Sequence, residues 1–203
     1  NLFAGGDIIV SRGIQGAEKA KVSARGTVFA DFIEHTVVVA GGNVQANTIL
    51  NSRISTDAEV VLTGKKGAII GGYTHALMGI TATEVGNPAE VRTVVHVGCE
   101  KEIYTKHQSA KVTEIALSDE IKEMAEELGM IYAKKKAGKI SELMEDRCKT
   151  LESKIASMKR DLGESSRERK AMEELITKGL SSEICISGNI YRGTVIGMAQ
   201  VQM

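Results

Sequence analysis

The sequence has very few aromatic residues and almost no proline. Aromatic residues make up 3 % of the chain, tryptophan is absent, and Pro88 is the only proline. A conventional globular core uses Phe, Tyr and Trp to fill volume, so this composition disfavours such a core. We therefore expect a thin, regular cross-section filled by Val, Ile and Ala.

Net charge, long apolar runs and closely spaced cysteines are also lacking. The 26 basic residues equal the 26 acidic ones, which argues against a nucleic-acid or anionic-membrane surface built from gross charge. No apolar run approaches the roughly 20 residues of a membrane span. The three cysteines are widely spaced, so we expect a reducing compartment and no disulfide framework. Because the chain begins at Asn1 and not at Met, we also expect residues to be missing upstream.

The composition divides the chain into two parts. Residues 1–99 hold most of the glycines and many β-branched residues, whereas residues 101–178 are rich in Glu, Lys, Met, Leu and Ala. The last stretch, residues 181–203, returns to the first composition. The sequence therefore predicts a β domain formed by residues 1–100 and 181–203, into which a helical segment, residues 101–180, is inserted.

A period of 16 residues runs through the first part. Three apolar columns share it: Val28, Val44 and Val60; Val22, Val38 and Ile54; Ile33 and Ile49. The turn residues Gly26, Gly42 and Ala58 keep the same spacing, while Ile8 lies 20 residues before Val28, which places extra residues around Gln15–Ala20. Coils of this length cannot bury their own apolar face, so neighbouring coils must cover it. This pattern predicts a β-solenoid, in which Gly41 and Gly42 form a corner and not a hairpin turn.

The inserted segment has a different period. Apolar residues recur at alternating steps of three and four at Ile103, Ala110, Leu117, Ile121, Met124, Leu128 and Ile131, and again at Met144, Cys148, Leu151, Ile155, Met158, Leu162, Met172 and Ile176. Polar residues interrupt the seam at His107, Glu114, Ser165 and Arg169. Such spacing predicts a coiled coil. Folding back at Lys134–Ser141 gives an antiparallel hairpin with arms 101–137 and 140–178. The alternative, one continuous rod, would separate the flanking β segments by on the order of 100 Å.

Several segments of the chain, in order, resemble the flagellar assembly protein A family. They are "GGDIIVSRGIQGAEKAKVSARGTVFADFIEHTVVVAGGNV", "ILNSRI", "GKKGAIIGG", "TVVHVG" and "GNIYRGTVIG". One departure is Arg192, where the family usually has proline. The resemblance implies a right-handed parallel β-helix (β-solenoid) with a coiled-coil hairpin. It also implies a bacterial cytoplasmic protein involved in flagellar assembly or placement, with no established catalytic reaction.

The stretch Thr63–Gly72 contains the best candidate site. It does not match a phosphate-binding P-loop, because Lys65 directly follows the first glycine and no Ser or Thr follows Lys66. Its glycines have two interpretations: a solenoid corner that needs positive φ and close approach between coils, or a partner- or anion-binding site. The second interpretation uses Lys65, Lys66, Gly71, Gly72, Tyr73 and His75.

The segment His96–Cys99 has a spacing found in metal sites, and we expect the closing strands to bring Cys185 near it. Strand parity argues against a metal, however. If Val95 and Val97 face inward, Cys99 does too while His96 faces outward, and Cys185 also faces outward. Ligands that do not converge cannot form a tetrahedral zinc site. The sequence therefore predicts no metal and no cofactor.

The sequence favours a non-enzymatic scaffold that binds protein partners, with self-association as a further expectation. Two alternatives remain. One is a solenoid that polymerises end to end, which would not need the helical arm. The other is an enzyme similar to β-helix acyltransferases, although those repeat strict hexads that this chain lacks.

Overall fold

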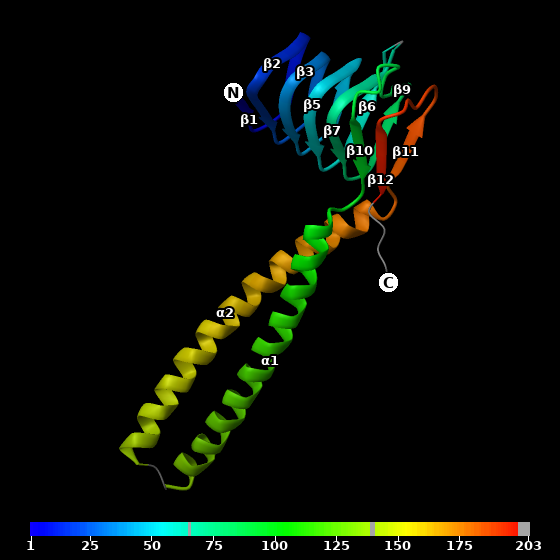
Figure 1. Cartoon of the computed structure of the whole chain (residues 1–203). Coiled ribbons are helices and arrows are strands. Elements are labelled where there is room, and N and C mark those ends of the chain that lie inside the picture. The colour runs from blue at the N-terminus through cyan, green and yellow to red at the C-terminus, as the bar shows by residue number, and fades with distance from the viewer. Residues whose placement is uncertain (65, 139–140, 199–203) are drawn as a thin grey trace. The chain divides into compact units, whose positions relative to one another are not determined.

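The computed structural model describes residues 1–64, 66–138 and 141–198, except for the side chain of Glu18. The chain forms two compact units (Figure 1). One contains Asn1–Lys101 and Leu175–Met203, and the other contains Glu102–Glu174. Each unit is considered by itself below.

The first unit is a parallel β-solenoid, as the 16-residue period predicted. Every pair of strands described within it is parallel. Its strands are β1 (Leu2–Ala4), β2 (Ile8–Ala24), β3 (Val28–Ala40), β4 (Val44–Ala46), β5 (Thr48–Thr56), β6 (Glu59–Leu62), β7 (Ala68–Ala76), β8 (Gly79–Ala82), β9 (Glu84–Val85), β10 (Thr93–Val97), β11 (Glu183–Ile186) and β12 (Thr194–Met198).

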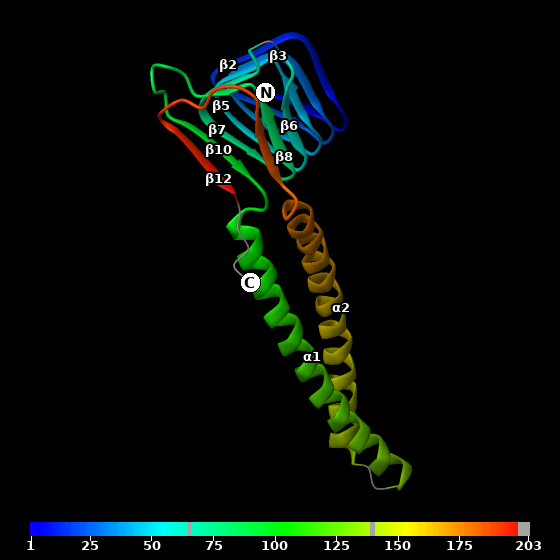
Figure 2. The same cartoon turned by 90° about the vertical axis from the view of Figure 1, so that its right-hand side faces the viewer.

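The strands stack in three ladders, and the longer strands bend from one ladder into the next (Figure 2). The first ladder contains the beginnings of β2 and β3, followed by β4, β6, β8 and β11. The second contains the middle parts of β2 and β3, followed by the beginnings of β5 and β7 and by β9. The third contains β1, the ends of β2, β3, β5 and β7, and then β10 and β12. Each coil therefore has three faces around a narrow core.

The stacking register confirms the apolar columns. Val44 aligns with Val28 on one side and Val60 on the other, and all three are fully buried. A hairpin at Gly41 and Gly42 would have paired the strands on either side of these two glycines with each other, so that alternative is excluded. The other two columns also stack as expected: Val22, Val38 and Ile54, and Ile33 and Ile49. The register shifts between Gln15 and Ala20, where the sequence predicted extra residues.

Buried hydroxyl groups satisfy the backbone where the second ladder turns into the third. The Ser52 hydroxyl donates to the Leu50 carbonyl oxygen at 2.8 Å and accepts the Thr36 N–H of the preceding coil at 3.2 Å. Thr93 repeats this arrangement and accepts the Gly71 N–H at 2.8 Å. Backbone polar groups that are buried without a partner are destabilising, so these two hydroxyl groups stabilise the corner.

The helical segment is inserted at a corner that recurs in every coil, between the third ladder and the first. Equivalent N–H groups mark this corner: Leu77 donates to Thr56 O and Gly98 donates to Ala76 O, both at 3.0 Å. After Gly98 the chain enters the helices, and the solenoid resumes at Glu183, whose N–H donates to Met78 O at 3.2 Å. The two ends of the insertion meet, because a Cβ atom on Gly179 would lie 2.7 Å from the Cys99 nitrogen.

The inserted segment forms two helices joined by a short turn, as predicted. They are α1 (Lys101–Lys136) and α2 (Glu142–Gly179), and Gly138 in the turn has a φ of 71°. Lys139 and Ile140 of the predicted turn lie outside the described residues. Side-chain contacts between the helices have an antiparallel order, since Tyr132 bonds Glu152 while Glu114, nearer the start of α1, bonds Arg169. None of the described helices has a stretch apolar enough to cross a membrane.

The seam positions face the interior of this hairpin. Four of the seam residues are buried: Ile131, Cys148, Leu151 and Ile155. The other seam residues are half-buried. Met124, Leu128 and Met144 pack against the cluster formed by Ile131, Cys148 and Leu151. The 3-4 spacing therefore identified the apolar faces correctly. The interlocked packing of a coiled coil stays a prediction.

Candidate functional site

The residues of the predicted partner- or anion-binding site lie on two sides of a bend in β7. Lys65 lies outside the described residues, and Lys66 is exposed in the turn before the strand. Gly71 and Gly72 form the bend, with φ of 71° and 79°, and Tyr73 and His75 follow it. The stretch thus spans two corners of one coil, and the lysine and the rings belong to different faces.

The two glycines of the bend have a clear structural role. Gly71 donates its N–H to Thr93 Oγ1 at 2.8 Å, so this group is not available to an anion. A Cβ atom on Gly72 would lie 2.2 Å from the Ser52 carbonyl oxygen, which only glycine avoids. Both requirements of the corner interpretation, positive φ and close approach, are therefore met. An anion or partner site at these residues stays a prediction.

The structure brings His75 together with His96, a residue outside the predicted set. They align on β7 and β10, and their rings stack with centroids 5.7 Å apart and an interplanar angle of 29°. His75 is only 6 % exposed, and its Nε2 lies 2.8 Å from the Gly98 carbonyl oxygen. Among the described groups, the buried Nδ1 atoms of both rings lack a hydrogen-bond partner. Glu100 lies nearby, with Oε1 4.0 Å from Nδ1 of His75.

Burial is the largest influence on the pKa of His96. Burial lowers the pKa of His96, and the adjacent His75 lowers it further, while Glu100 acts in the opposite direction. Burial and Glu100 together raise the pKa of the Cys99 thiol. The thiol is therefore held in its protonated form, which is a poor nucleophile. His96 is therefore uncharged near neutral pH.

Tyr73 lies beside this pair, under a cationic side chain from the preceding coil. Arg53 Cζ is 5.4 Å from the centre of the Tyr73 ring, a cation–π contact. Burial and then Glu100 raise the pKa of Tyr73, and Arg53 opposes them. Sequence reasoning missed Arg53 and Glu100, and it considered His96 only as a metal ligand and not as a partner of His75. The signal for His96 was its place between inward Val95 and Val97, which matches the place of His75 in β7.

The alternation of inward and outward residues expected for the metal-like segment agrees with the burial of its side chains, and the absence of a metal stays a prediction. Val95, Val97 and Cys99 are buried, and Cys185 is exposed. The expectation that Cys185 comes near this segment was wrong, because β11 stacks on β8 in the first ladder, where Cys185 aligns with Thr81. No group of three His, Cys, Asp or Glu side chains suitable for a metal occurs within the described part of the chain.

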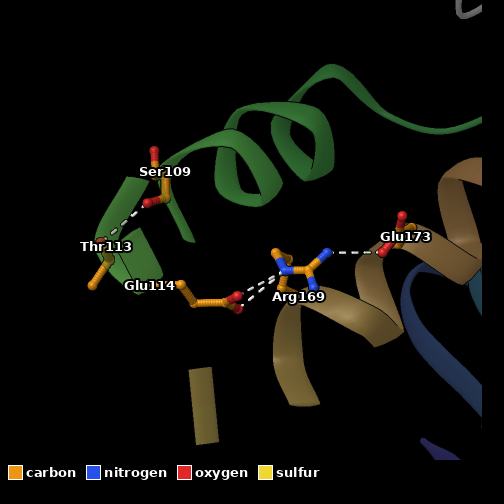
Figure 3. A network of polar contacts seen from close by, with 5 residues as sticks. All are labelled: Ser109, Thr113, Glu114, Arg169 and Glu173. Atoms are coloured by element: carbon orange, nitrogen blue, oxygen red, sulfur yellow. Dashed lines mark hydrogen bonds and ion pairs between the residues drawn. The ribbon is translucent and has the colours of Figure 1, made fainter. Parts of the chain in front are cut away.

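In the hairpin, two polar seam residues meet each other (Figure 3). The Nε atom of Arg169 lies 3.1 Å and 3.0 Å from the two carboxylate oxygens of Glu114, and Nη1 donates to Glu173 at 2.8 Å. The side chains of Arg169 and Glu114 are 21 % and 17 % exposed. A charged pair at one level of an apolar seam favours one alignment of the helices over others.

An open groove lies between the helices near the turn. Its lining includes Met130, Ile131 and Lys134 of α1 and Leu143, Met144 and Arg147 of α2. Met130 and Leu143 are 63 % and 81 % exposed, and together in one groove they form an exposed apolar patch, a feature of interaction sites. This surface is the strongest candidate for protein binding in the hairpin.

Comparison with known proteins supports one assignment. No curated protein and no solved structure matches the chain significantly. The family model described as Flagellar Assembly Protein A beta solenoid domain matches residues 1–203. The match and the parallel solenoid together show that the chain belongs to the Flagellar Assembly Protein A β-solenoid domain family, which implies a role in flagellar assembly.

Proposed function

We propose that this chain is a non-enzymatic scaffold in bacterial flagellar assembly, in which the helical hairpin binds a protein partner. The supporting observation is that the ladders continue across the insertion. On its far side β12 stacks on β10, starting at Thr194 on Thr93, and β11 stacks on β8, starting at Glu183 on Gly79. The hairpin is therefore not needed to complete the solenoid, which supports a separate role for it.

Two further parts of this proposal concern packing and location. The regular burial of seam residues on α1 and α2 supports packing as an antiparallel coiled coil. Cys99 and Cys148 are buried free thiols, which supports a reducing compartment, and we assign the chain to the cytoplasm.

Deletion of the hairpin tests the proposal. Lys101–Leu180 is replaced by a short flexible linker, and the variant is compared with the full chain in a flagellated bacterium that lacks the protein. We expect the variant to keep its β-type circular dichroism but to lose partner capture and flagellar assembly. Normal flagella with the deletion variant would contradict the proposal. So would an acyl-transfer activity of the full chain that a single change such as His75→Ala abolishes.

A second candidate function is end-to-end polymerisation of the solenoid. It is favoured by exposed apolar residues on the two outermost strands of the third ladder: Leu2 and Phe3 on β1, and Val195 and Ile196 on β12. Open strand edges readily pair with other chains. Filaments that form equally well without the hairpin, and that Phe3→Lys prevents, would favour this function over the scaffold.

A further inference from the structure

The groove near the hairpin turn has a floor that continues the hairpin core. Ile131 belongs to the buried cluster between the helices, Met144 packs against that cluster, and both line the groove. Met130 and Leu143 stand beside them with most of their surface exposed. Two helices leave a furrow between them along each flank, and a third helix fills such a furrow by inserting its own side chains. The shape and chemistry of this surface therefore suit an amphipathic helix.

The charges around the groove are mostly compensated within the hairpin. Arg147 donates to both carboxylate oxygens of Glu127 at 2.8 Å, and Asp146 lies 3.4 Å from the ammonium group of Lys149. Lys134 also lines the groove and, among the described residues, has no carboxylate within 4.0 Å. The positive charge of Lys134 is thus the uncompensated charge of this surface.

Lys136, also in the last turn of α1, strengthens this positive field. Lys135 lies between the two lysines in sequence and is compensated by Glu145 at 3.5 Å. Glu142 and Glu145 lie in the first turn of α2, where the helix dipole favours their negative charges. A ligand with carboxylates beside its apolar face would therefore be attracted to Lys134 and Lys136.

We propose that this groove binds an amphipathic helix of a partner protein, with apolar residues against Met130 and Leu143 and carboxylates beside Lys134. Such a helix presents apolar side chains at positions i, i+3, i+4 and i+7, the usual pattern of helix-in-groove recognition. The proposal rests on the proposed scaffold function and gives its partner a chemical class.

Two synthetic peptides test this proposal on the full 203-residue chain. Both are helix-forming, with leucine at i, i+3, i+4 and i+7, and they differ only in their flanking residues, which are glutamate in one and lysine in the other. Fluorescence anisotropy measures their dissociation constants at low and high salt. We expect the glutamate peptide to bind at least about tenfold more tightly at low salt, and the preference to shrink as salt screens the charges.

Variants in the chain separate the apolar contribution from the charged one. Leu143→Ser is expected to weaken the glutamate peptide about tenfold, because it removes an apolar contact. Lys134→Glu is expected to abolish the preference between the peptides. Val112→Ser is the matched control, since Val112 is 67 % exposed on α1 and does not line the groove, and it should change neither constant.

Three results would overturn the proposal. They are equal binding of the two peptides, an equal loss with Val112→Ser and Leu143→Ser, and self-association of the chain that Leu143→Ser abolishes. Failure of this proposal is distinguishable from failure of the scaffold function. If the hairpin deletion abolishes flagellar assembly while Leu143→Ser leaves it intact, the hairpin binds its partner elsewhere and the scaffold function still holds.

Discussion

The stacked isoleucine column offers a quantitative test of the solenoid core. Ile49 is fully buried between Ile33 and Ile69 of the adjacent coils. The change Ile49→Ala removes three carbon atoms, worth about 2.4 kcal/mol at ~0.8 kcal/mol for each buried group. Branched side chains on both sides hinder collapse, so a cavity term adds to this loss. We expect the free energy of unfolding to fall by about 3–4 kcal/mol, within the usual range of about 2–5 kcal/mol.

Urea denaturation followed by circular dichroism measures this change, and hydrogen exchange locates it. Because each coil of a solenoid contacts only its neighbours, the loss of protection should be largest in the coils that hold Ile33, Ile49 and Ile69. Ile9→Ala is the matched control, since Ile9 is 75 % exposed on β2, and its effect should stay within about 0.5 kcal/mol. Equal effects of the two substitutions would refute the stacked core.

Three further predictions concern the coil length, the polar seam pair and the histidine pair. Deletion of Val44–Glu59, one coil of the period, should leave a shorter folded solenoid, whereas deletion of Val44–Val60 should not fold, because the extra residue reverses the inward and outward faces downstream. Arg169→Leu alone should lower the melting temperature, because it leaves the half-buried carboxylate of Glu114 without its partner, while the double change with Glu114→Leu should restore it, because an apolar pair can replace a paired charge. Stability should fall as the pH drops below about 6.5, because the pKa of His96 is lowered by folding and the unfolded chain then binds the proton more readily.

Each of these predictions has its own control and its own contrary result. For the deletions, circular dichroism and gel filtration must separate the two variants, and similar behaviour of both would contradict the stacking register. For the seam pair, a double variant that melts no higher than Arg169→Leu alone would show that the carboxylate of Glu114 does not need a partner in the seam. For the histidines, His96→Gln should flatten the dependence of the melting temperature on pH, and an unchanged dependence would assign it to other groups.

The solenoid could be predicted because equivalent positions of stacked coils need similar residues, which then recur at a fixed spacing in the sequence. Val28, Val44 and Val60 occupy the same place in successive coils, so one spacing identifies both the fold and the buried residues. The helical hairpin could be predicted equally well, because its apolar residues recur at steps of three and four along two long segments. These features depend on many residues that obey one rule, which a single sequence can reveal.

The histidine pair could not be predicted in the same way, because it arises where the period breaks. His75 and His96 are 21 residues apart in sequence, while the earlier columns repeat at 16, so their register could not be derived from the spacing. The contact between Glu114 and Arg169 was easier to predict from the sequence. Both residues were recognised as polar positions of the seam, and their opposite charges suit a pair, but the alignment of the two helices was needed to join them.

The place of the insertion lets the length of the arm vary independently of the solenoid. The chain leaves the coil at Gly98 and returns at Glu183, and Gly179 closes against Cys99, so the base of the arm is fixed by a few residues. Adding or removing one heptad in each helix would change the arm by about 10 Å and keep the seam in phase. A longer or shorter helical hairpin can therefore be joined to the same solenoid.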